Sequence, residues 1–310
     1  MDWKAFIDEQ IDSIRQAVGD GLAINALSGG VDSSVVTVLG HRALGDRLKT
    51  VFIDNALMRE GEPEFVVQTF AEMGIPVQRV NARQEFLGAL AGLTDPEEKR
   101  NAITATFYRQ VFGRLVRETG AKFLLHGTIL TDIEETVAGI KRQHNILAQI
   151  GIDPEQVYGY QVLEPLQTLR KDGVRQVAQF VGLPPSITQR IPFPGPALAA
   201  RIVGEVTPER LATVRAATAV VEQELADTNA FQYMAVLLQD KATGIRDGRR
   251  EFGDIIVVRC IDSVDAREAT VVELPWPKLH RICQRVTSLP GVNRCLYDLT
   301  PKPPATVEYV

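Results

Sequence analysis

Short apolar runs alternate with stretches of helical periodicity along the first part of the chain, and this alternation limits the possible fold more than any other feature. The runs that predict buried strands are 22–27, 48–54, 75–82 and 121–128. Helices are predicted before and between them, at 6–18, 33–44, 62–74 and 97–118. Strands joined by helices lie parallel with right-handed connections, so this part predicts an α/β fold with a doubly wound parallel sheet. Ligands of such sheets bind at the carboxyl ends of the strands, where we expect Leu27, Asp54 and Gly127 to converge.

The chain changes character at 184–208, a stretch rich in proline and glycine. After it, the pattern predicts a second, smaller α+β domain. Its helices are expected at 208–226 and 276–289, and its strands at 233–238, 253–261 and 295–300. We therefore expect two domains, 1–195 and 196–310.

Composition excludes several classes of protein. The net charge of −5 argues against a surface dominated by nucleic-acid binding. No apolar run approaches the ~20 residues that a membrane-spanning helix needs, and the first ten residues are charged where a signal peptide would be apolar. The three cysteines are odd in number, far apart and without a CxxC pair, which is typical of a reducing compartment. We expect a cytoplasmic protein that binds neither nucleic acid nor membrane.

The segment SGGVDSS (28–34) stands where the first strand ends and a helix begins. Unpaired N–H groups and the helix dipole attract an anion there, and glycines let the backbone approach its oxygens. Serine hydroxyls can donate to phosphate, whereas an aspartate in the same cradle indicates a cation, Mg²⁺, between carboxylate and phosphate. The segment is neither GxxxxGK[ST] nor GxGxxG, so it predicts neither a Walker site nor a dinucleotide site. A glycine turn with a capped helix is the simpler alternative for SGG alone.

SGGVDSS after a buried strand resembles the pyrophosphate loop of the N-type ATP pyrophosphatases, whose fold is adenine nucleotide α-hydrolase-like. These enzymes adenylate an oxygen, after which nitrogen or sulfur displaces AMP. Further stretches resemble the synthetase part of the GMP synthase family. They are VFIDNALMR (51–59), DPEEKR (95–100), HGTILTDIEE (126–135), LEPL (163–166), FPGPALAAR (193–201) and YDLTPKPPATVEY (297–309). The resemblance implies a ligase that aminates XMP to GMP, using ATP, Mg²⁺ and ammonia and releasing AMP and pyrophosphate.

The resemblance also implies roles for individual residues. Those expected to bind ATP are Ser28, Gly29, Gly30, Val31, Asp32, Ser33, Ser34, Ile53, Asp54 and Ala56. Asp32, Glu135 and Lys141 are expected to be catalytic, with Asp32 and Glu135 as Mg²⁺ ligands. Those expected to bind XMP are Arg100, Arg201, Gln232, Lys302 and Glu308.

The chain departs from the family pattern at several positions. The family usually has glycine where this chain has Ala56, Thr104 and Ala197. It usually has glutamine at position 126, histidine at positions 143 and 191, a different continuation after position 145 and a different pair of last residues. A divergent member of the same fold that adenylates another acceptor is therefore an open alternative, and a partner that binds ATP without catalysis is a second.

A triad-type glutaminase needs a cysteine on a tight glycine-flanked turn. Cys260, Cys283 and Cys295 stand in no such turn. We therefore expect ammonia to come free or from a separate glutaminase subunit. By resemblance to the family, we also expect a homodimer formed through the C-terminal domain.

Overall fold

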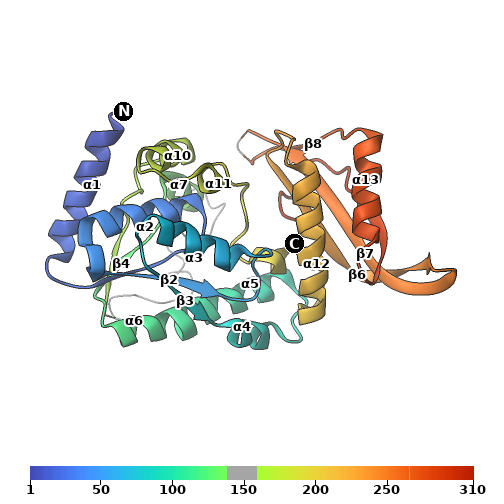
Figure 1. Ribbon diagram of the computed structural model, residues 1–310, viewed down its shortest axis with the longest axis horizontal. Helices are drawn as coiled ribbons and strands as arrows, with labels where there is room; N and C mark the ends of the chain where they lie inside the picture. Colours follow the sequence, from blue (N-terminus) through green and yellow to red (C-terminus); the bar gives the residue numbers. More distant parts are fainter. Residues whose placement is uncertain (138–158, 265) are drawn as a thin grey trace. The chain divides into compact units, whose positions relative to one another are not determined.

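The computed structural model describes residues 1–137, 159–264 and 266–310, with side chains omitted at 134–137 (Figure 1). Backbone contacts divide the chain into two compact units. The first unit comprises 1–54, 63–82 and 104–190, and the second comprises 55–62, 83–103 and 191–310. The second unit thus takes in two segments that precede the predicted boundary in sequence. The domain boundary between 195 and 196 stays a prediction.

A five-stranded parallel sheet forms the centre of the first unit. Its strands are β1 (Ala23–Ala26), β2 (Leu48–Asp54), β3 (Val77–Asn81), β4 (Phe123–Leu125) and β5 (Gln161–Leu163). Their order is β3-β2-β1-β4-β5, with Ala23 level with both Leu48 and Phe123. The chain therefore changes direction of winding between β1 and β4. In doubly wound sheets such a switch point leaves a crevice at the carboxyl ends of the two strands.

Helices cover both sides of this sheet. Figure 1 shows α1 and α10 on one side and α6 on the other. The helices of the first unit are α1 (Trp3–Val18), α2 (Val31–Leu44), η1 (Gly45–Arg47), α3 (Glu62–Glu72), the π-helix η2 (Thr106–Phe112), α6 (Gly113–Thr119), α7 (Leu130–Val137), α10 (Lys171–Phe180) and α11 (Pro185–Thr188). In α1 the buried residues are the five apolar ones whose spacing predicted a helix, namely Phe6, Ile7, Ile11, Ile14 and Val18.

The second unit is built on a mixed sheet. Its strands are β6 (Gln232–Arg246), β7 (Arg249–Asp262), β8 (Thr270–Val271) and β9 (Val292–Tyr297), with β9 parallel to β7 and the other pairs antiparallel. Its helices are α4 (Arg83–Leu90), most of α5 (Pro96–Ala105), the short η3 (Ala197–Arg201), α12 (Pro208–Leu225) and α13 (Trp276–Thr287). The turn between β6 and β7 is Asp247-Gly248, both at positive φ, which suits the tight turn of a two-residue hairpin.

The predicted fold class, a doubly wound parallel sheet with a smaller α+β part, is confirmed. The strand at 48–54 has the predicted bounds. The structure differs at 97–118, where the predicted single helix is interrupted by the π-helix η2. Helices α4 and α10 and strand β5 were not predicted. Within the described residues no helix is both long and apolar enough to span a membrane.

Candidate nucleotide site

The loop between β1 and α2 leaves the N-terminus of α2 open. Gly30 is the N-cap residue, and within the described residues this helix end has no side-chain cap hydrogen bond. Gly29 has φ +81°, a conformation that glycine adopts without strain. The helix N-terminus therefore presents unpaired donors at the carboxyl end of β1, as an anion site requires.

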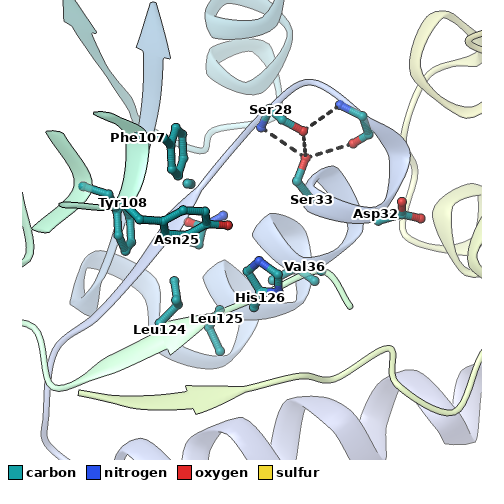
Figure 2. A pocket seen from close by; sticks show the side chains of 14 residues that line it. Asn25, Ser28, Asp32, Ser33, Val36, Phe107, Tyr108, Leu124, Leu125 and His126 are labelled. Atoms are coloured by element: carbon teal, nitrogen blue, oxygen red, sulfur yellow. Dashed lines mark hydrogen bonds between the residues drawn. The ribbon is translucent and has the colours of Figure 1, made fainter. Parts of the chain in front are cut away.

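Two serine hydroxyls close this loop. Ser33 Oγ donates to Gly30 O at 3.1 Å, and the two hydroxyls of Ser28 and Ser33 lie 2.9 Å apart (Figure 2). Because the Ser33 proton is given to Gly30 O, Ser28 is the donor between the two hydroxyls. Ser28 Oγ in turn accepts from Gly30 N at 3.3 Å. The loop thus keeps its hydroxyls at the mouth of the helix N-terminus, bonded to each other.

Asp32 lies in the first turn of α2 and pairs with a lysine from a distant part of the sequence. Lys171 Nζ, at the start of α10, lies 2.6 Å from Asp32 Oδ2. The other oxygen, Asp32 Oδ1, is buried and has no hydrogen-bond partner within the described residues. A carboxylate oxygen in this position can accept a cation. The described residues contain no group of three or more His, Cys, Asp or Glu side chains placed to hold a metal ion.

A pocket of about 240 Å³ lies beside this loop, at the switch point between β1 and β4. Figure 2 shows side chains of both strands and the loop around it. The lining residues are Asn25, Ala26, Ser28, Gly30, Asp32, Ser33, Val36, Phe107, Tyr108, Phe112, Leu124, Leu125, His126 and Gly127. The pocket therefore joins a polar end at the open helix to an apolar and aromatic wall.

The π-helix η2 supplies the aromatic wall. Phe107 and Phe112 are stacked with ring centroids 6.0 Å apart, and Phe107 meets Tyr108 edge-on at 4.8 Å. Burial raises the pKa of Tyr108 to about 12, so its hydroxyl keeps its proton at neutral pH. Single π-helical turns often mark functional sites. Aromatic rings of this kind can pack against a planar base.

His126 follows β4 and belongs to a hydrogen-bonded chain. Its Nδ1 lies 2.8 Å from Thr128 Oγ1, which donates to Glu164 Oε1 at 2.6 Å. Because the Thr128 proton is given to the carboxylate, Thr128 Oγ1 must accept from His126 Nδ1–H. These hydrogen bonds therefore imply that a neutral His126 carries its proton on Nδ1 and leaves Nε2 unprotonated.

Gly127 lets β4 approach the loop closely. A Cβ at this position would lie 3.3 Å from both Asp32 C and Ser33 N. A larger residue would displace the first turn of α2. Gly127 therefore helps to position the loop and the first turn of α2 against the end of β4.

The structure brings together only some of the residues predicted to bind ATP. Ser28, Gly30, Asp32 and Ser33 line the pocket, and Gly29 lies in the loop between them. The others are absent from the lining, namely Val31, Ser34, Ile53, Asp54 and Ala56.

The expected convergence of Leu27, Asp54 and Gly127 is only partly correct, because Gly127 alone of the three lines the pocket. Leu27 is buried, with its N–H donating to Val51 O. The Asp54 carboxylate is buried against Arg79 Nη2 at 2.6 Å. This hydrogen bond raises the pKa of Arg79.

Glu135 and Lys141 stay predictions. The backbone of Glu135 lies in α7, but its side chain is not described. Lys141 lies outside the described residues.

The sequence analysis did not predict the aromatic residues of η2 or the role of Lys171. It also did not predict the hydrogen bonds that join His126 through Thr128 to Glu164. For Lys171 the only sequence signal is a basic residue that opens the helix after LEPL. That signal cannot identify a partner 139 positions away.

Three of the residues predicted to bind XMP form a cluster in the second unit. Glu308 accepts from Arg201 Nε at 3.5 Å and also from the Gln232 amide. Arg201 is fully buried, yet its Nη1 and Nη2 have no hydrogen-bond partner within the described part of the chain. Burial lowers the pKa of Arg201. Buried donors without partners are costly, so they indicate a place for a ligand's acceptor atoms.

An aromatic ring supports the same cluster. The Arg201 guanidinium lies 4.8 Å from the centre of the Phe193 ring, and that of Arg59 lies 3.8 Å from it. Arg59 also pairs with Glu222 at 2.6 Å. Both arginines are therefore held by cation–π contact as well as by carboxylates.

The other two predicted residues have different surroundings. Arg100 is exposed on α5 and pairs with Glu97. Lys302 Nζ donates to Ala266 O at 2.7 Å. No described hydrogen bond or ion pair joins either side chain to Arg201, Gln232 or Glu308.

Comparison with known proteins identifies the family of this chain. A model of the family described as "GMP synthase C terminal domain" matches residues 219–309. A protein of Archaeoglobus fulgidus that is named as one subunit of glutamine-hydrolyzing GMP synthase is 50% identical over 310 residues, covering 100% of both chains. The protein of the same name from Pyrococcus horikoshii is 47% identical over 313 residues, again covering 100% of both.

A solved structure of NH3-dependent NAD synthetase from Campylobacter jejuni covers 63% of this chain and 80% of its own, with 14% identity and a TM-score of 0.49, a likeness too weak to bear on function. The full-length relatives decide the family. This chain belongs to the GMP synthase family, which confirms the family and the enzyme class, a ligase forming a C–N bond, that its sequence predicted.

Proposed function

We propose that this chain aminates XMP to GMP at the expense of ATP. The C2 oxygen of XMP attacks the α-phosphorus of ATP, and pyrophosphate leaves. Ammonia then attacks C2, AMP leaves with the former C2 oxygen, and the surplus proton passes to solvent. The observation that carries the proposal is the open N-terminus of α2 directly beside an aromatic-walled pocket at the switch point of the sheet.

That arrangement suits ATP because the polar end of the pocket matches the phosphates and the aromatic wall matches the base. The N–H groups of α2 and the hydroxyls of Ser28 and Ser33 suit the terminal phosphates. The rings of Phe107 and Tyr108 suit the base. Lys171 adds a cation at the polar end of the pocket, where it can offset charge on the leaving pyrophosphate.

Mg²⁺ fits the same end of the pocket. It prefers one or two carboxylates together with phosphate oxygens, and Asp32 Oδ1 is a buried carboxylate oxygen with no described partner. Bound there, Mg²⁺ would neutralise charge on the phosphates. Glu135 stays a predicted second ligand, and Lys141 a predicted catalytic residue.

The acceptor site is proposed around Arg201, Gln232 and Glu308. The unpartnered Nη1 and Nη2 of Arg201 suit acceptor oxygens, whereas Glu308 suits the N–H groups of a xanthine ring. Arg100 and Lys302 are the further predicted contacts. We also propose that ammonia comes from a separate glutaminase subunit, that the chain forms a homodimer, and that it works in the cytoplasm.

The test is to incubate the protein with ATP, Mg²⁺, XMP and ammonium and to measure AMP, pyrophosphate and GMP. We expect equal amounts of the three, and none when XMP is omitted. Release of AMP with another carbonyl acceptor but not with XMP would overturn the proposal. Asp32→Ala should abolish turnover, while Asp20→Ala, which changes an exposed aspartate, should not.

A further inference from the structure

Residues 202–205, which directly follow Arg201, are held by two cations. Lys99 Nζ donates to the carbonyls of Ile202 at 2.7 Å and Gly204 at 3.1 Å. The guanidinium of Arg210 donates to the carbonyl of Val203 at 2.8 Å and to that of Glu205. Lys99 thus binds the carbonyls of residues 202 and 204, and Arg210 those of 203 and 205, so the two cations together hold four successive carbonyls.

Neither cation is an ordinary surface residue. Lys99 is 2% exposed, and its Nζ makes a third contact, with Ala199 O at 3.4 Å. Burial, helped by the nearby charge of Arg210, lowers the pKa of Lys99 to about 8. Burial also lowers the pKa of Arg210. A buried lysine and a half-buried arginine are thus kept close together, which costs free energy unless both are hydrogen-bonded, as they are here to backbone carbonyls.

The hydrogen bonds of Lys99 and Arg210 connect the surroundings of Arg100 with those of Arg201, which is far away in sequence. Lys99 is next to Arg100 on α5, and the segment that it holds directly follows Arg201. Arg210 lies in the first turn of α12 and also donates to Leu238 O at 2.9 Å, close to the end of the buried part of β6. Lys99 and Arg210 therefore fix the backbone of Arg201 against both α5 and β6.

We propose that Lys99 and Arg210 are positioning residues for the acceptor, forming a clamp that sets where the Arg201 guanidinium points. This inference rests on the proposed function, because the acceptor is XMP. The unpartnered nitrogens of Arg201 can meet the acceptor only if the backbone on either side of it is fixed. Loosening the clamp lets Arg201 turn away, which weakens acceptor binding and leaves ATP binding in the first unit unchanged.

The experiment compares Lys99→Met and Arg210→Met with wild type and with Lys241→Met. Lys241 makes a half-exposed ion pair with Asp254 in the same unit, so its loss controls for removing a cation. KM for XMP should rise at least tenfold in both clamp variants, with KM for ATP within twofold of wild type. Lys99→Arg and Arg210→Lys, which keep a cationic donor, should recover part of the loss. Lys241→Met should behave as wild type.

The experiment distinguishes a failure of the proposed function from a failure of the clamp. If wild type makes no GMP from XMP, the proposed function fails. If wild type is active and KM for XMP stays within twofold in a folded clamp variant, the clamp is wrong. Near-UV circular dichroism identifies folded variants, and if one methionine variant does not fold, the other decides. If neither folds, Lys99→Gln and Arg210→Gln, which remove the positive charge but keep a polar side chain, decide by the same criterion.

Discussion

Single side chains decide the chemistry of the pocket, and the ion pair between Asp32 and Lys171 is the clearest case. Lys171 Nζ is a charged donor at the open end of α2, contributed by another helix. It pairs with Asp32, which lines the pocket. The pair therefore links the loop to α10.

Lys171→Met should lower kcat by about 100-fold, because removing one preorganised donor to developing charge costs roughly this much. Steady-state pyrophosphate release with XMP and ammonium measures it. The matched control is Lys49→Met, an exposed lysine of β2. Equal kcat in the Lys171 and Lys49 variants would show that Lys171 has no part in the reaction.

Three alanines of the described residues, Ala56, Ala197 and Ala266, stand in the left-handed region of backbone conformation, and the first two bear on the family pattern. Ala56 has φ +67° and Ala197 has φ +53°. At both positions the family usually has glycine, so the sequence had already marked them. Both alanines have the positive φ that glycine adopts easily. A Cβ in this conformation costs about 1–2 kcal/mol per residue.

Ala197→Gly should therefore leave the protein about 1–2 kcal/mol more stable than Ala200→Gly does. Both alanines are buried in η3, and only Ala197 of the two has a positive φ. Each substitution removes a buried methyl group and raises the entropy of the unfolded chain, so these two effects largely cancel when the variants are compared. Urea unfolding of the two variants measures the difference. Equal stabilities would mean that Ala197 carries no strain.

Lys99 should give stability a pH dependence. Its pKa is about 8 in the folded protein and 10.5 ordinarily, so between these values the unfolded chain binds more protons. The free energy of unfolding should then rise as pH increases from 8 towards 10.5. Urea unfolding at pH 7, 8, 9 and 10 should show this rise in wild type relative to Lys99→Met. Parallel curves for the two proteins would contradict it.

At the scale of elements, the C-terminal segment is fixed by one buried arginine of β7. Arg259 is 1% exposed and pairs with Asp298 at 2.6 Å. It also donates to Thr300 O at 2.7 Å and Thr306 O at 2.9 Å. One side chain thus ties the strand to the segment that carries Lys302 and Glu308.

Arg259→Met should release this segment. We expect faster amide exchange at 298–308 and a KM for XMP raised at least tenfold, with KM for ATP unchanged. Hydrogen–deuterium exchange and steady-state kinetics measure the two effects. Arg281→Met, which removes a half-exposed arginine of α13, is the control and should leave both unchanged. Unchanged exchange in the Arg259 variant would show that other contacts hold the segment.

At the scale of the whole molecule, the chain is expected to depend on an outside source of ammonia. Its full-length relatives are named as one subunit of a glutamine-hydrolyzing synthase. Two of its three cysteines are poorly suited to be a glutaminase nucleophile: Cys260 is buried on β7, and burial raises the pKa of Cys260 to about 11 and of Cys295 to about 12. Thiols with such values are poor nucleophiles at neutral pH.

The isolated chain should therefore make GMP from ammonium but not from glutamine. Adding the separate glutaminase subunit should restore the use of glutamine, while the rate with saturating ammonium should change little. GMP formation with each nitrogen source measures this. Glutamine-dependent activity of the isolated chain would contradict the assignment of two subunits.

The fold could be predicted where local patterns are strong. The five buried residues of α1, the bounds of β2 and the alternation of strands and helices follow from periodicity and from apolar runs. Helix α10 was missed, although it places Lys171 in the site. The π-helix was also missed, because its extra residue per turn leaves no mark in a helical pattern.

The family, the parallel sheet and the loop that opens α2 could be predicted from the sequence, because each depends on residues close together in the chain or on order along it. Which side chains meet depends on the folded arrangement. The pairing of Lys171 with Asp32, the aromatic wall from η2 and the grip of Lys99 and Arg210 on 202–205 join distant segments. Such contacts are selected by how helices pack on a sheet and which polar groups must be satisfied there, and neither can be read from spacing.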